Sequence, residues 1–283
     1  MFEIDNHIIK LYNIDHFDPE QTFLCGQCFR WEKTEDGTFF GVVGDAAVKL
    51  YYHDEKTIYL ESSKPDLVYW SRYLNFSNDY NNIENLLGAD EHLRPCIESG
   101  RGIRILRQEL WETIVSFIIS ANNNIPRIKK IIASLCELYG QKIEFDGKVF
   151  YGFPKPETLA ALTIDDLAPI RAGFRDKYIL DAAHRIASGE INLDEVQKMN
   201  SRDAKTTLMQ IKGVGSKVAD CVLLFALGRY ETFPKDVWIK RILNEVYGIE
   251  EKEIDSFAAK HFGKFAGIAQ QYLYYYYAII QGA

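Results

Sequence analysis

Short apolar runs separated by turn signals make up the first part of the chain. Between residues 20 and 62 these runs are rich in aromatic and β-branched residues and follow one another about every ten residues. Runs of this composition, bounded by Gly and Asp, are typical of strands joined by tight turns. We therefore expect an antiparallel meander with one packed face and one solvated face. The predicted strands cover 21–33, 38–45, 46–53 and 57–63, with turns at 35–37, 44–45 and 53–54.

The apolar period becomes helical after Pro65. Leu67, Trp70 and Leu74 recur at the spacing of one helix face, and from Glu109 onward almost all of the chain reads as helix. The predicted helices cover 110–121, 125–139, 178–187, 202–211, 217–227, 237–247 and 265–280. A small sheet followed by a larger helical part predicts an α+β fold.

The same change of pattern suggests two domains. Residues 1–105 are expected to form an N-terminal antiparallel β-sheet domain with flanking helices. Residues 106–283 are expected to form a helical domain that contains a helix–hairpin–helix. The helical domain can divide into two helical subdomains with the active site in the cleft between them.

The formal net charge of the 283 residues is −7, which is the wrong sign for a generic DNA-binding protein. Two segments depart from this average: 201–241 has eight Lys or Arg against four Asp or Glu, and 100–130 has six against two. Polyanion binding depends on where cations lie as well as on their sum. The charge therefore does not exclude DNA, although solvated helix faces also produce such basic runs.

Cysteine and histidine positions give no sign of a metal or a cofactor. The five cysteines are scattered, which argues against a disulfide framework. Cys25 and Cys28 have CxxC spacing, but no second pair or histidine lies nearby, so a strand-turn feature is the better interpretation. The six histidines show no metal-ligand spacing.

No membrane association or secretion is expected. The first residues carry acids and lack the apolar core of a signal peptide, and the most apolar stretch, 272–280, is too short to span a bilayer. We expect a cytoplasmic monomer, associated with the nucleoid in a bacterium or located in the nucleus of a eukaryote.

The most informative segment is a glycine turn between two predicted helices. One helix ends at Ile211, Gly213 and Gly215 form a tight turn, and an almost wholly apolar helix follows. This is a helix–hairpin–helix, whose exposed N–H groups at a helix N-terminus suit a phosphate. The alternative is an ordinary glycine turn. Because many non-enzymatic proteins also use the hairpin, it indicates nucleic-acid contact rather than catalysis.

Lys217 and Asp236 add possible chemistry to the hairpin. Lys217 lies in the first turn of the apolar helix, where the helix dipole and desolvation both favour the neutral, nucleophilic amine. Asp236 follows Pro234 and is placed to cap the helix that begins at Val237. It can also face the Lys217 amine across a cleft and stabilise a cationic sugar. The alternatives are a solvated lysine and an aspartate that only caps.

These residues resemble a known superfamily. GVGSKVADC followed by PKDVW is similar to the helix–hairpin–helix Gly-Pro-Asp DNA glycosylases, whose lysine-bearing members use the lysine and aspartate at this spacing as the catalytic pair. The resemblance implies that Lys217 and Asp236 are that pair. Lys212 stands where the superfamily commonly has proline, and Asp236 follows Pro-Lys rather than Gly-Pro.

A second motif resembles the 8-oxoguanine glycosylase family in particular. Gly26 begins a GQCFRW segment similar to the family's GQxFRW, in which the glycine carbonyl accepts a hydrogen bond from the N7–H of oxidised guanine. Normal guanine presents N7 as an acceptor, so two facing acceptors in a buried site would cost about 1–3 kcal/mol. The resemblance also implies that Gln270 pairs with the Watson–Crick edge of the base, and that Cys221 and Tyr274 sandwich its faces.

Further motifs imply contacts with the opened duplex. Asn122 begins an NNN-I-x-R turn in which the first Asn fills the gap left by the flipped nucleotide and Arg127 reads the orphaned cytosine. Gly173-Phe174-Arg175 resembles a wedge aromatic followed by a second cytosine-reading arginine. Trp238, a further expected DNA contact, departs from the pattern of the eukaryotic enzymes, which usually have a phosphate-contacting histidine there.

The resemblance covers about residues 20 to 280 and implies a bifunctional glycosylase and AP lyase for 8-oxoguanine in duplex DNA, preferably opposite cytosine. An iron–sulfur glycosylase is disfavoured because no cysteine follows Cys221. An alkylation-repair glycosylase would not need Lys217. A glycosylase for other damaged purines, and a non-catalytic helix–hairpin–helix DNA-binding protein, remain as alternatives.

Overall fold

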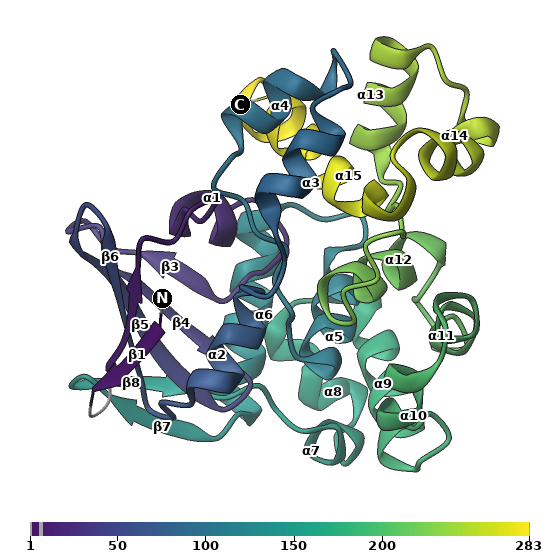
Figure 1. The fold of residues 1–283 in the computed structure, drawn as a ribbon. Coiled ribbons are helices and arrows are strands. Elements are labelled where there is room, and N and C mark those ends of the chain that lie inside the picture. The colour runs from purple at the N-terminus through teal and green to yellow at the C-terminus, as the bar shows by residue number, and fades with distance from the viewer. Residues whose placement is uncertain (1, 6–7, 283) are drawn as a thin grey trace.

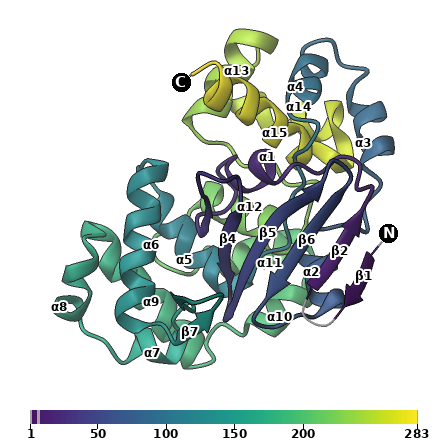
Figure 2. The same ribbon diagram turned by 90° about the vertical axis from the view of Figure 1, so that its left-hand side faces the viewer.

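The computed structural model describes residues 2–5 and 8–282. Its first part is a six-stranded antiparallel sheet with strand order β1-β2-β6-β5-β4-β3, seen on the left of Figure 1 and in front in Figure 2. The three predicted strands after residue 37 are confirmed. The strands are β1 (Phe2–Asp5), β2 (Ile8–Tyr12), β3 (Trp31–Lys33), β4 (Phe39–Val43), β5 (Ala46–Asp54) and β6 (Thr57–Ser62).

The predicted strand over 21–33 is wrong over 21–30. Helix α1 (Pro19–Phe23) occupies its start, because the Asp18 carboxylate accepts a hydrogen bond of 2.8 Å from the Gln21 N–H and Pro19 occupies the first turn. The chain then bends through Gly26 and pairs with the sheet only from Trp31. Strands β1 and β2 were not predicted, and β2 pairs with β6 in the middle of the sheet.

Alternating residues of the sheet bury one face. Val48 and Leu50 of β5 and Leu60 of β6 are fully buried, together with Trp70 on helix α2 (Leu67–Tyr73), which covers this face. Residues of one strand that are two apart point to the same side, so the burial follows the period of two in the sequence. The sheet therefore has its own hydrophobic core.

The second part of the molecule is helical, as the sequence predicted. The predicted helices 125–139 and 237–247 agree with α6 and α13 at both ends. Its helices are α5 (Leu110–Ser120), α6 (Ile125–Tyr139), α7 (Pro156–Ala160), α8 (Ile164–Leu167), α9 (Asp176–Ala187), α10 (Leu193–Lys198), α11 (Ser201–Leu208), α12 (Ser216–Phe225), α13 (Val237–Tyr247), α14 (Ile254–His261) and α15 (Ala266–Tyr274), which continues as a π-helical segment (Tyr275–Ile280).

The expectation that almost everything after Glu109 is helical is wrong between α6 and α7. There the chain forms an antiparallel hairpin of β7 (Lys142–Phe145) and β8 (Lys148–Tyr151). Asp146 and Gly147 both have positive φ, as a two-residue hairpin turn requires. The hairpin lies beside β5, where Lys49 forms an ion pair of 3.3 Å with Asp146.

Two helices from the first hundred residues pack with the helical core. Helices α3 (Tyr80–Leu87) and α4 (Leu93–Ser99) bury their apolar faces in this core rather than in the core of the sheet, and α4 packs against α15. Figure 1 shows them in one group with α13, α14 and α15, while α5 to α11 form the other helical group. The predicted division at 105/106 stays a prediction.

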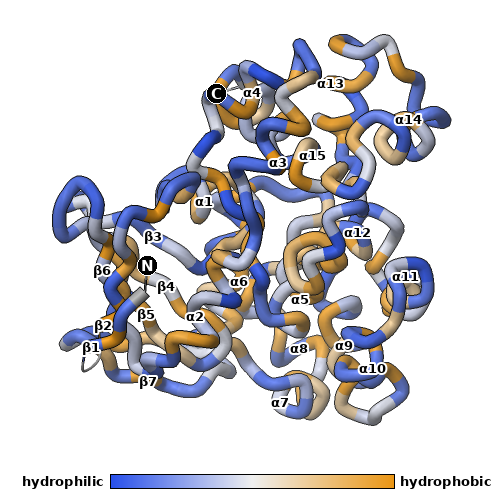
Figure 3. The backbone as a smooth tube through the Cα atoms, viewed as in Figure 1, coloured by the Kyte–Doolittle hydropathy of each residue, from blue (hydrophilic) through white to orange (hydrophobic). Residues whose placement is uncertain are grey.

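Helices α5 and α12 form the centre of the helical part. Figure 3 shows both as mainly hydrophobic segments inside a more polar periphery. They pack against each other, and from Val218 to Phe225 every residue of α12 is buried. This buried helix provides a rigid base for side chains at its N-terminal end. Within the described chain, every helix is too short or too polar to cross a membrane.

Candidate active site

The predicted helix–hairpin–helix is confirmed between α11 and α12. Gly213 has φ +86°, and a Cβ at this position would lie 2.6 Å from the ring of Tyr178 on α9, so only glycine fits. Gly215 is the N-cap of α12 and has open space around it. In the described part of the chain no side chain caps this helix, so the N–H groups of its first turn face outward and can bind an anion.

Lys212 explains how the hairpin is held without the usual proline. Its backbone N–H, which a proline would lack, donates a hydrogen bond of 2.9 Å to the carboxylate of Asp181 on α9, and its ammonium lies 3.4 Å from the same carboxylate. A second ion pair joins the two hairpin helices, because Lys205 on α11 lies 2.7 Å from Asp220 on α12. Burial raises the pKa of Asp220, and the Lys205 ammonium opposes this rise.

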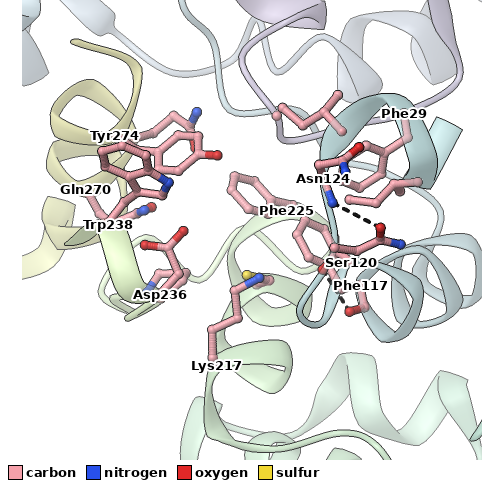
Figure 4. A pocket seen from close by; sticks show the side chains of 17 residues that line it. Phe29, Phe117, Ser120, Asn124, Lys217, Phe225, Asp236, Trp238, Gln270 and Tyr274 are labelled. Carbon is pink, nitrogen blue, oxygen red and sulfur yellow. Dashed lines mark hydrogen bonds between the residues drawn. The ribbon is translucent and has the colours of Figure 1, made fainter. Parts of the chain in front are cut away.

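A cavity of about 310 Å³ opens where α12 meets the N-terminus of α13, helix α15, the loop of Gly26 and the end of α5. In Figure 4 residues of α13 and α15 form one wall, α5 and the following turn form the other, and Lys217 rises between them. Its volume is at the lower end of the range of about 300–1,000 Å³ typical of small-molecule pockets. Seven of the predicted site residues line it: Gly26, Lys217, Cys221, Asp236, Trp238, Gln270 and Tyr274.

Lys217 extends from the first turn of α12 into the cavity. Its ammonium nitrogen lies 5.3 Å from the centre of the Phe117 ring, and Phe117 stacks on Phe225 with ring centres 5.5 Å apart. Among residues 2–5 and 8–282, no ion pair engages this ammonium. The lysine therefore has an apolar, aromatic surrounding and no bound carboxylate, which leaves it accessible to a ligand in the cavity.

Asp236 caps α13, as predicted. One carboxylate oxygen accepts a hydrogen bond of 2.8 Å from the Ile239 N–H. Figure 4 shows the carboxylate on the wall of the cavity, close to Gln270 and facing the side on which Lys217 lies. The cap fixes the direction of this carboxylate. Asp236 can therefore cap α13 and also stabilise a cationic sugar in the cavity.

Gln270 presents a polar group that the protein itself leaves unpaired. Its side chain is only 5% exposed, and its carbonyl oxygen Oε1 has no hydrogen-bond partner in the described part of the chain. The neighbouring Gln271 is instead used in the fold, where it donates to the Cys25 carbonyl at 2.9 Å. Buried polar atoms are nearly always paired. The exception at Gln270 therefore indicates a ligand with hydrogen-bond donors.

Gly26 lies against Tyr274 on the same side of the cavity. Its φ of +84° disfavours other residues, and a Cβ would lie 3.3 Å from a carbon of the Tyr274 ring. Burial raises the pKa of Tyr274 to about 12 and that of Cys221 to about 11, the latter opposed by the nearby Lys217 ammonium. Both groups are therefore uncharged at neutral pH, and they offer neutral surfaces to a planar base.

The remaining predicted DNA contacts lie outside the cavity, on the turns beside it and in the hairpin. Asn122 follows α5 and has a left-handed backbone with φ +49°, and Arg127 is exposed on the first turn of α6. Phe174 is 52% exposed, whereas Arg175 is only 3% exposed. The sequence does not distinguish these two environments, because Phe and Arg follow each other in an irregular segment.

Three phenylalanines in the cavity wall were not among the predicted site residues. Phe29, Phe117 and Phe225 line the cavity and contact one another in an aromatic cluster. In the sequence they look like ordinary core residues on predicted helices or strands. No local signal separates an aromatic residue that packs in a core from one that lines a cavity. In the described part of the chain no cluster of His, Cys, Asp or Glu is suited to a metal ion.

Comparisons with known proteins agree with this geometry. Residues 9–114 match the family model of the 8-oxoguanine DNA glycosylase N-terminal domain, and residues 115–265 match that of the HhH-GPD superfamily of base excision DNA repair proteins. The structure of MBOgg1 in complex with a low-affinity DNA ligand is 44% identical, with a TM-score of 0.95, and the match covers 100% of this chain and 99% of that chain.

Two further relatives give the same result. The Clostridium acetobutylicum 8-oxoguanine glycosylase/lyase, in complex with dsDNA containing cytosine opposite 8-oxoG, is 36% identical with a TM-score of 0.94, over 100% of this chain and 99% of that one. A probable N-glycosylase/DNA lyase of Methanothermobacter thermautotrophicus is 31% identical over 208 residues, which are 65% of this chain and 66% of that protein.

The hairpin, the Lys217 and Asp236 cavity and the family match define a base excision DNA repair protein of the HhH-GPD superfamily. Within that superfamily, the matching N-terminal domain and the full-length structural relatives distinguish one group. The chain belongs to the 8-oxoguanine DNA glycosylase family.

Proposed function

We propose that this protein is a bifunctional DNA glycosylase and AP lyase that excises 8-oxoguanine from duplex DNA, preferably opposite cytosine. The observation that carries the proposal is the cavity itself. It combines an amine, Lys217, with an unpaired buried amide, Gln270, and a glycine loop at Gly26. The family match and the name of the Clostridium relative, an 8-oxoguanine glycosylase/lyase, support this substrate.

Recognition of the base follows from the polar atoms of the cavity. The unpaired Gln270 oxygen can accept hydrogen bonds from the N–H donors on the Watson–Crick edge of a guanine. The Gly26 carbonyl can accept the N7–H that only the oxidised base has. The faces of the base would then lie between Cys221 and Tyr274. In this arrangement normal guanine is rejected because its N7 lone pair would face another acceptor.

The chemistry requires the neutral form of Lys217. The amine attacks C1′ of the flipped nucleotide, the C1′–N9 bond breaks with its electron pair on the departing base, and the base takes up a proton. Asp236 stabilises the positive charge that develops on the sugar. The aminal opens to a Schiff base, and loss of a proton from C2′ then expels the 3′ phosphate by β-elimination. Lys217 is the amine that lines the cavity from the first turn of α12, so it is the group placed for this attack.

Access to the base requires an opened duplex. The uncapped N-terminus of α12, with Gly213 and Gly215, can bind a backbone phosphate. Flipping a base costs a few kcal/mol, which the contacts with the opened duplex must offset. We assign the exposed Phe174 as the wedge and Asn122 as the residue that fills the gap, with Trp238 at the cavity mouth as a further DNA contact. Arg127 and Arg175 are the candidates for reading the opposite base.

Borohydride trapping tests the proposal. A duplex with one 8-oxoguanine opposite cytosine should give strand cleavage and, with borohydride, a covalent protein–DNA adduct. Lys217→Gln should lose both by at least about a thousandfold, because the variant lacks the amine that forms the Schiff base. Lys198→Gln, on the exposed end of α10, is the matched control and should keep both.

Two results would contradict the proposal in different ways. Tight binding of lesion DNA without base release would favour a non-catalytic helix–hairpin–helix protein. Release of other damaged purines in preference to 8-oxoguanine would retain the mechanism and reject the substrate.

We also propose a monomer that works where the genome is, at the nucleoid of a bacterium or in the nucleus of a eukaryote. Light scattering of the free protein checks the monomer.

A further inference from the structure

The loop of Gly26 carries the carbonyl that is expected to read N7 of the base, and the orientation of this carbonyl decides which bases it rejects. Gly26 has φ +84°, a conformation that leaves the chain free to turn sharply at this point. In the described part of the chain no backbone or side-chain donor reaches the Gly26 carbonyl itself. Its direction is therefore set by the contacts that hold the residues on either side of it.

Gln271 on α15 holds the residue before Gly26. Its side-chain amide donates a hydrogen bond of 2.9 Å to the Cys25 carbonyl, and 246 positions in the sequence separate the two residues. Gln271 is 2% exposed and Cys25 is fully buried, so water does not replace this bond. Turning the peptide group between Cys25 and Gly26 would leave a buried carbonyl without a donor, which is unfavourable.

Two further amides hold the residue after Gly26. The side chain of Gln27 is fully buried and donates to the carbonyls of Thr22 and Arg104, both at 2.8 Å. Gln108, just before α5, donates to the backbone carbonyl of Gln27 at 2.7 Å. The Gly26 carbonyl therefore lies between two residues whose positions are fixed by buried hydrogen bonds.

Gln271 also connects this loop to the part of the cavity that is expected to bind the Watson–Crick edge. It directly follows Gln270, whose unpaired oxygen lines the cavity and which Figure 4 shows on the same wall as Tyr274. Successive residues of a helix point about 100° apart, so one side chain can face the ligand while the next faces the loop. Helix α15 thereby fixes the distance between the two acceptors, the Gln270 oxygen and the Gly26 carbonyl.

An acceptor can reject another acceptor only as far as it is prevented from turning away. Guanine presents a lone pair at N7, where 8-oxoguanine presents an N–H. A freely rotating Gly26 carbonyl would turn away from this lone pair at little cost, and guanine would then be tolerated. With the Gln271 hydrogen bond in place, the same rotation breaks a buried contact. The stiffness of the loop therefore determines selectivity at N7.

We propose that Gln271 is a positioning residue for selectivity, because its hydrogen bond to Cys25 keeps the Gly26 carbonyl facing N7 of the bound base. Gln108 acts in the same way from the other side of the loop, through Gln27. The inference rests on the proposed function for its substrate, a purine extruded into the cavity. It separates two tasks of α15: Gln270 contacts the base, whereas Gln271 holds the group that reads N7.

Binding to duplexes with 8-oxoguanine or 8-bromoguanine opposite cytosine isolates the reading of N7. Both bases have the same Watson–Crick edge and a substituent at C8, but N7 is a donor in the first and an acceptor in the second. Dissociation constants are measured in a Lys217→Gln background, so that no base is released. This parent should prefer the 8-oxoguanine duplex by about tenfold to a hundredfold, the effect of replacing a buried hydrogen bond by two facing acceptors.

The variants should separate the two glutamines of α15. Gln271→Met keeps the length of the side chain but not the donor, so it should weaken binding of the 8-oxoguanine duplex by about tenfold and leave the 8-bromoguanine duplex within about twofold or tighter. Gln270→Leu should weaken both duplexes by a similar factor, because both bases share the edge that it contacts. Gln108→Leu, at a half-buried position, should act like Gln271→Met but by about threefold. Gln197→Leu, exposed on α10, is the neutral control.

The inference is overturned if Gln271→Met weakens both duplexes equally, which is the result of a merely structural role, or if Gln270→Leu changes the preference as much as Gln271→Met does. A parent that binds both duplexes equally also overturns it. If Gln271→Met does not fold, an unchanged preference in Gln108→Leu has the same meaning. Failure of the proposed function looks different: the protein with Lys217 intact would release no base, while the binding preference and its dependence on Gln271 would remain.

Discussion

Individual side chains in the cavity are arranged for a ligand at the expense of the free protein. Gln270 is buried with an unpaired carbonyl oxygen, and Lys217 lies among aromatic rings without a carboxylate partner. The unpaired oxygen of Gln270 is unfavourable in the absence of DNA. Strained or unsatisfied groups of this kind are concentrated at functional sites, where the substrate provides the missing contacts.

Gln270→Leu tests this trade-off. Leucine has a similar volume and no polar atom, so removing the unpaired amide should leave the melting temperature unchanged or raise it by a few degrees. Excision of 8-oxoguanine should fall by about tenfold to a hundredfold, because the hydrogen bonds to the Watson–Crick edge are lost. Differential scanning fluorimetry and single-turnover cleavage measure the two effects. A parallel loss of stability and activity would show that Gln270 serves the fold.

At the scale of elements, the helices around the cavity are held together by carboxylates that each contact several segments. Asp220 joins the two helices of the hairpin through Lys205. Asp90 accepts hydrogen bonds from the Leu93 N–H at the start of α4, from Tyr247 at the end of α13 and from His261 at the end of α14. The Asp90 contacts fix α13, whose N-cap is Asp236, relative to α4 and α14.

Asp90 gives a pH-dependent prediction. Burial disfavours its charged form, but the hydrogen bonds from His261, the Leu93 N–H and Tyr247 together hold its pKa below the usual value. A carboxylate with a lowered pKa stabilises the fold at pH values above its unfolded pKa of about 3.9, and this contribution disappears as the pH falls through the folded value. Asp90→Asn should therefore lower stability by about 1–3 kcal/mol at pH 7.

The difference between Asp90→Asn and the wild type should narrow as the pH falls below about 4, because the carboxyl of the unfolded wild type takes up a proton there, whereas the folded one, with its lower pKa, does so only at lower pH. Urea unfolding at pH 7, 5 and 3 measures it. Asp45→Asn is the control, because it removes only an exposed ion pair with Lys64, which contributes about 0–1 kcal/mol. A deficit that stays constant down to pH 3 would show that the charge of Asp90 is not what stabilises these helices.

At the scale of the whole molecule, the basic segment 201–241 has fewer free cations than its composition suggests. Five of the eight Lys and Arg between 201 and 241 form ion pairs with acidic residues: Lys205 with Asp220, Lys212 with Asp181, Lys235 with Asp255, Lys240 with Glu251, and Arg241 with Glu245. Four of these acids lie outside the segment. Together with the net charge of −7, this leaves few cations for DNA phosphates.

Binding of undamaged duplex should therefore depend only moderately on salt. Each neutralised phosphate contributes about −0.9 to the slope of log K against log salt concentration. With few available cations, we expect a slope of magnitude about 2–4, measured by fluorescence anisotropy between 50 and 200 mM KCl. A slope of about −8 or steeper would mean that the paired lysines exchange their carboxylates for phosphates.

The sequence by itself determined the elements that depend on local signals. The helices 125–139 and 237–247 follow from helical periodicity, the second with Asp236 as its predicted N-cap, and the hairpin follows from Gly213 and Gly215. Turn residues and β-branched runs predicted β4, β5 and β6 for the same reason. Motifs also supplied the lysine, the aspartate and the base-contacting residues, because their spacing resembles that of a known family.

Only the tertiary structure decided which of these residues meet and in what environment. Gly26 and Tyr274 are close in space although nearly the whole chain separates them, and the aromatic wall around Lys217 joins residues from three segments. Burial of Arg175 and unpaired burial of Gln270 likewise depend on neighbours distant in sequence. Local patterns specify backbone conformation, whereas exposure, charge pairing and hydrogen-bond satisfaction are set by contacts between segments that only the fold brings together.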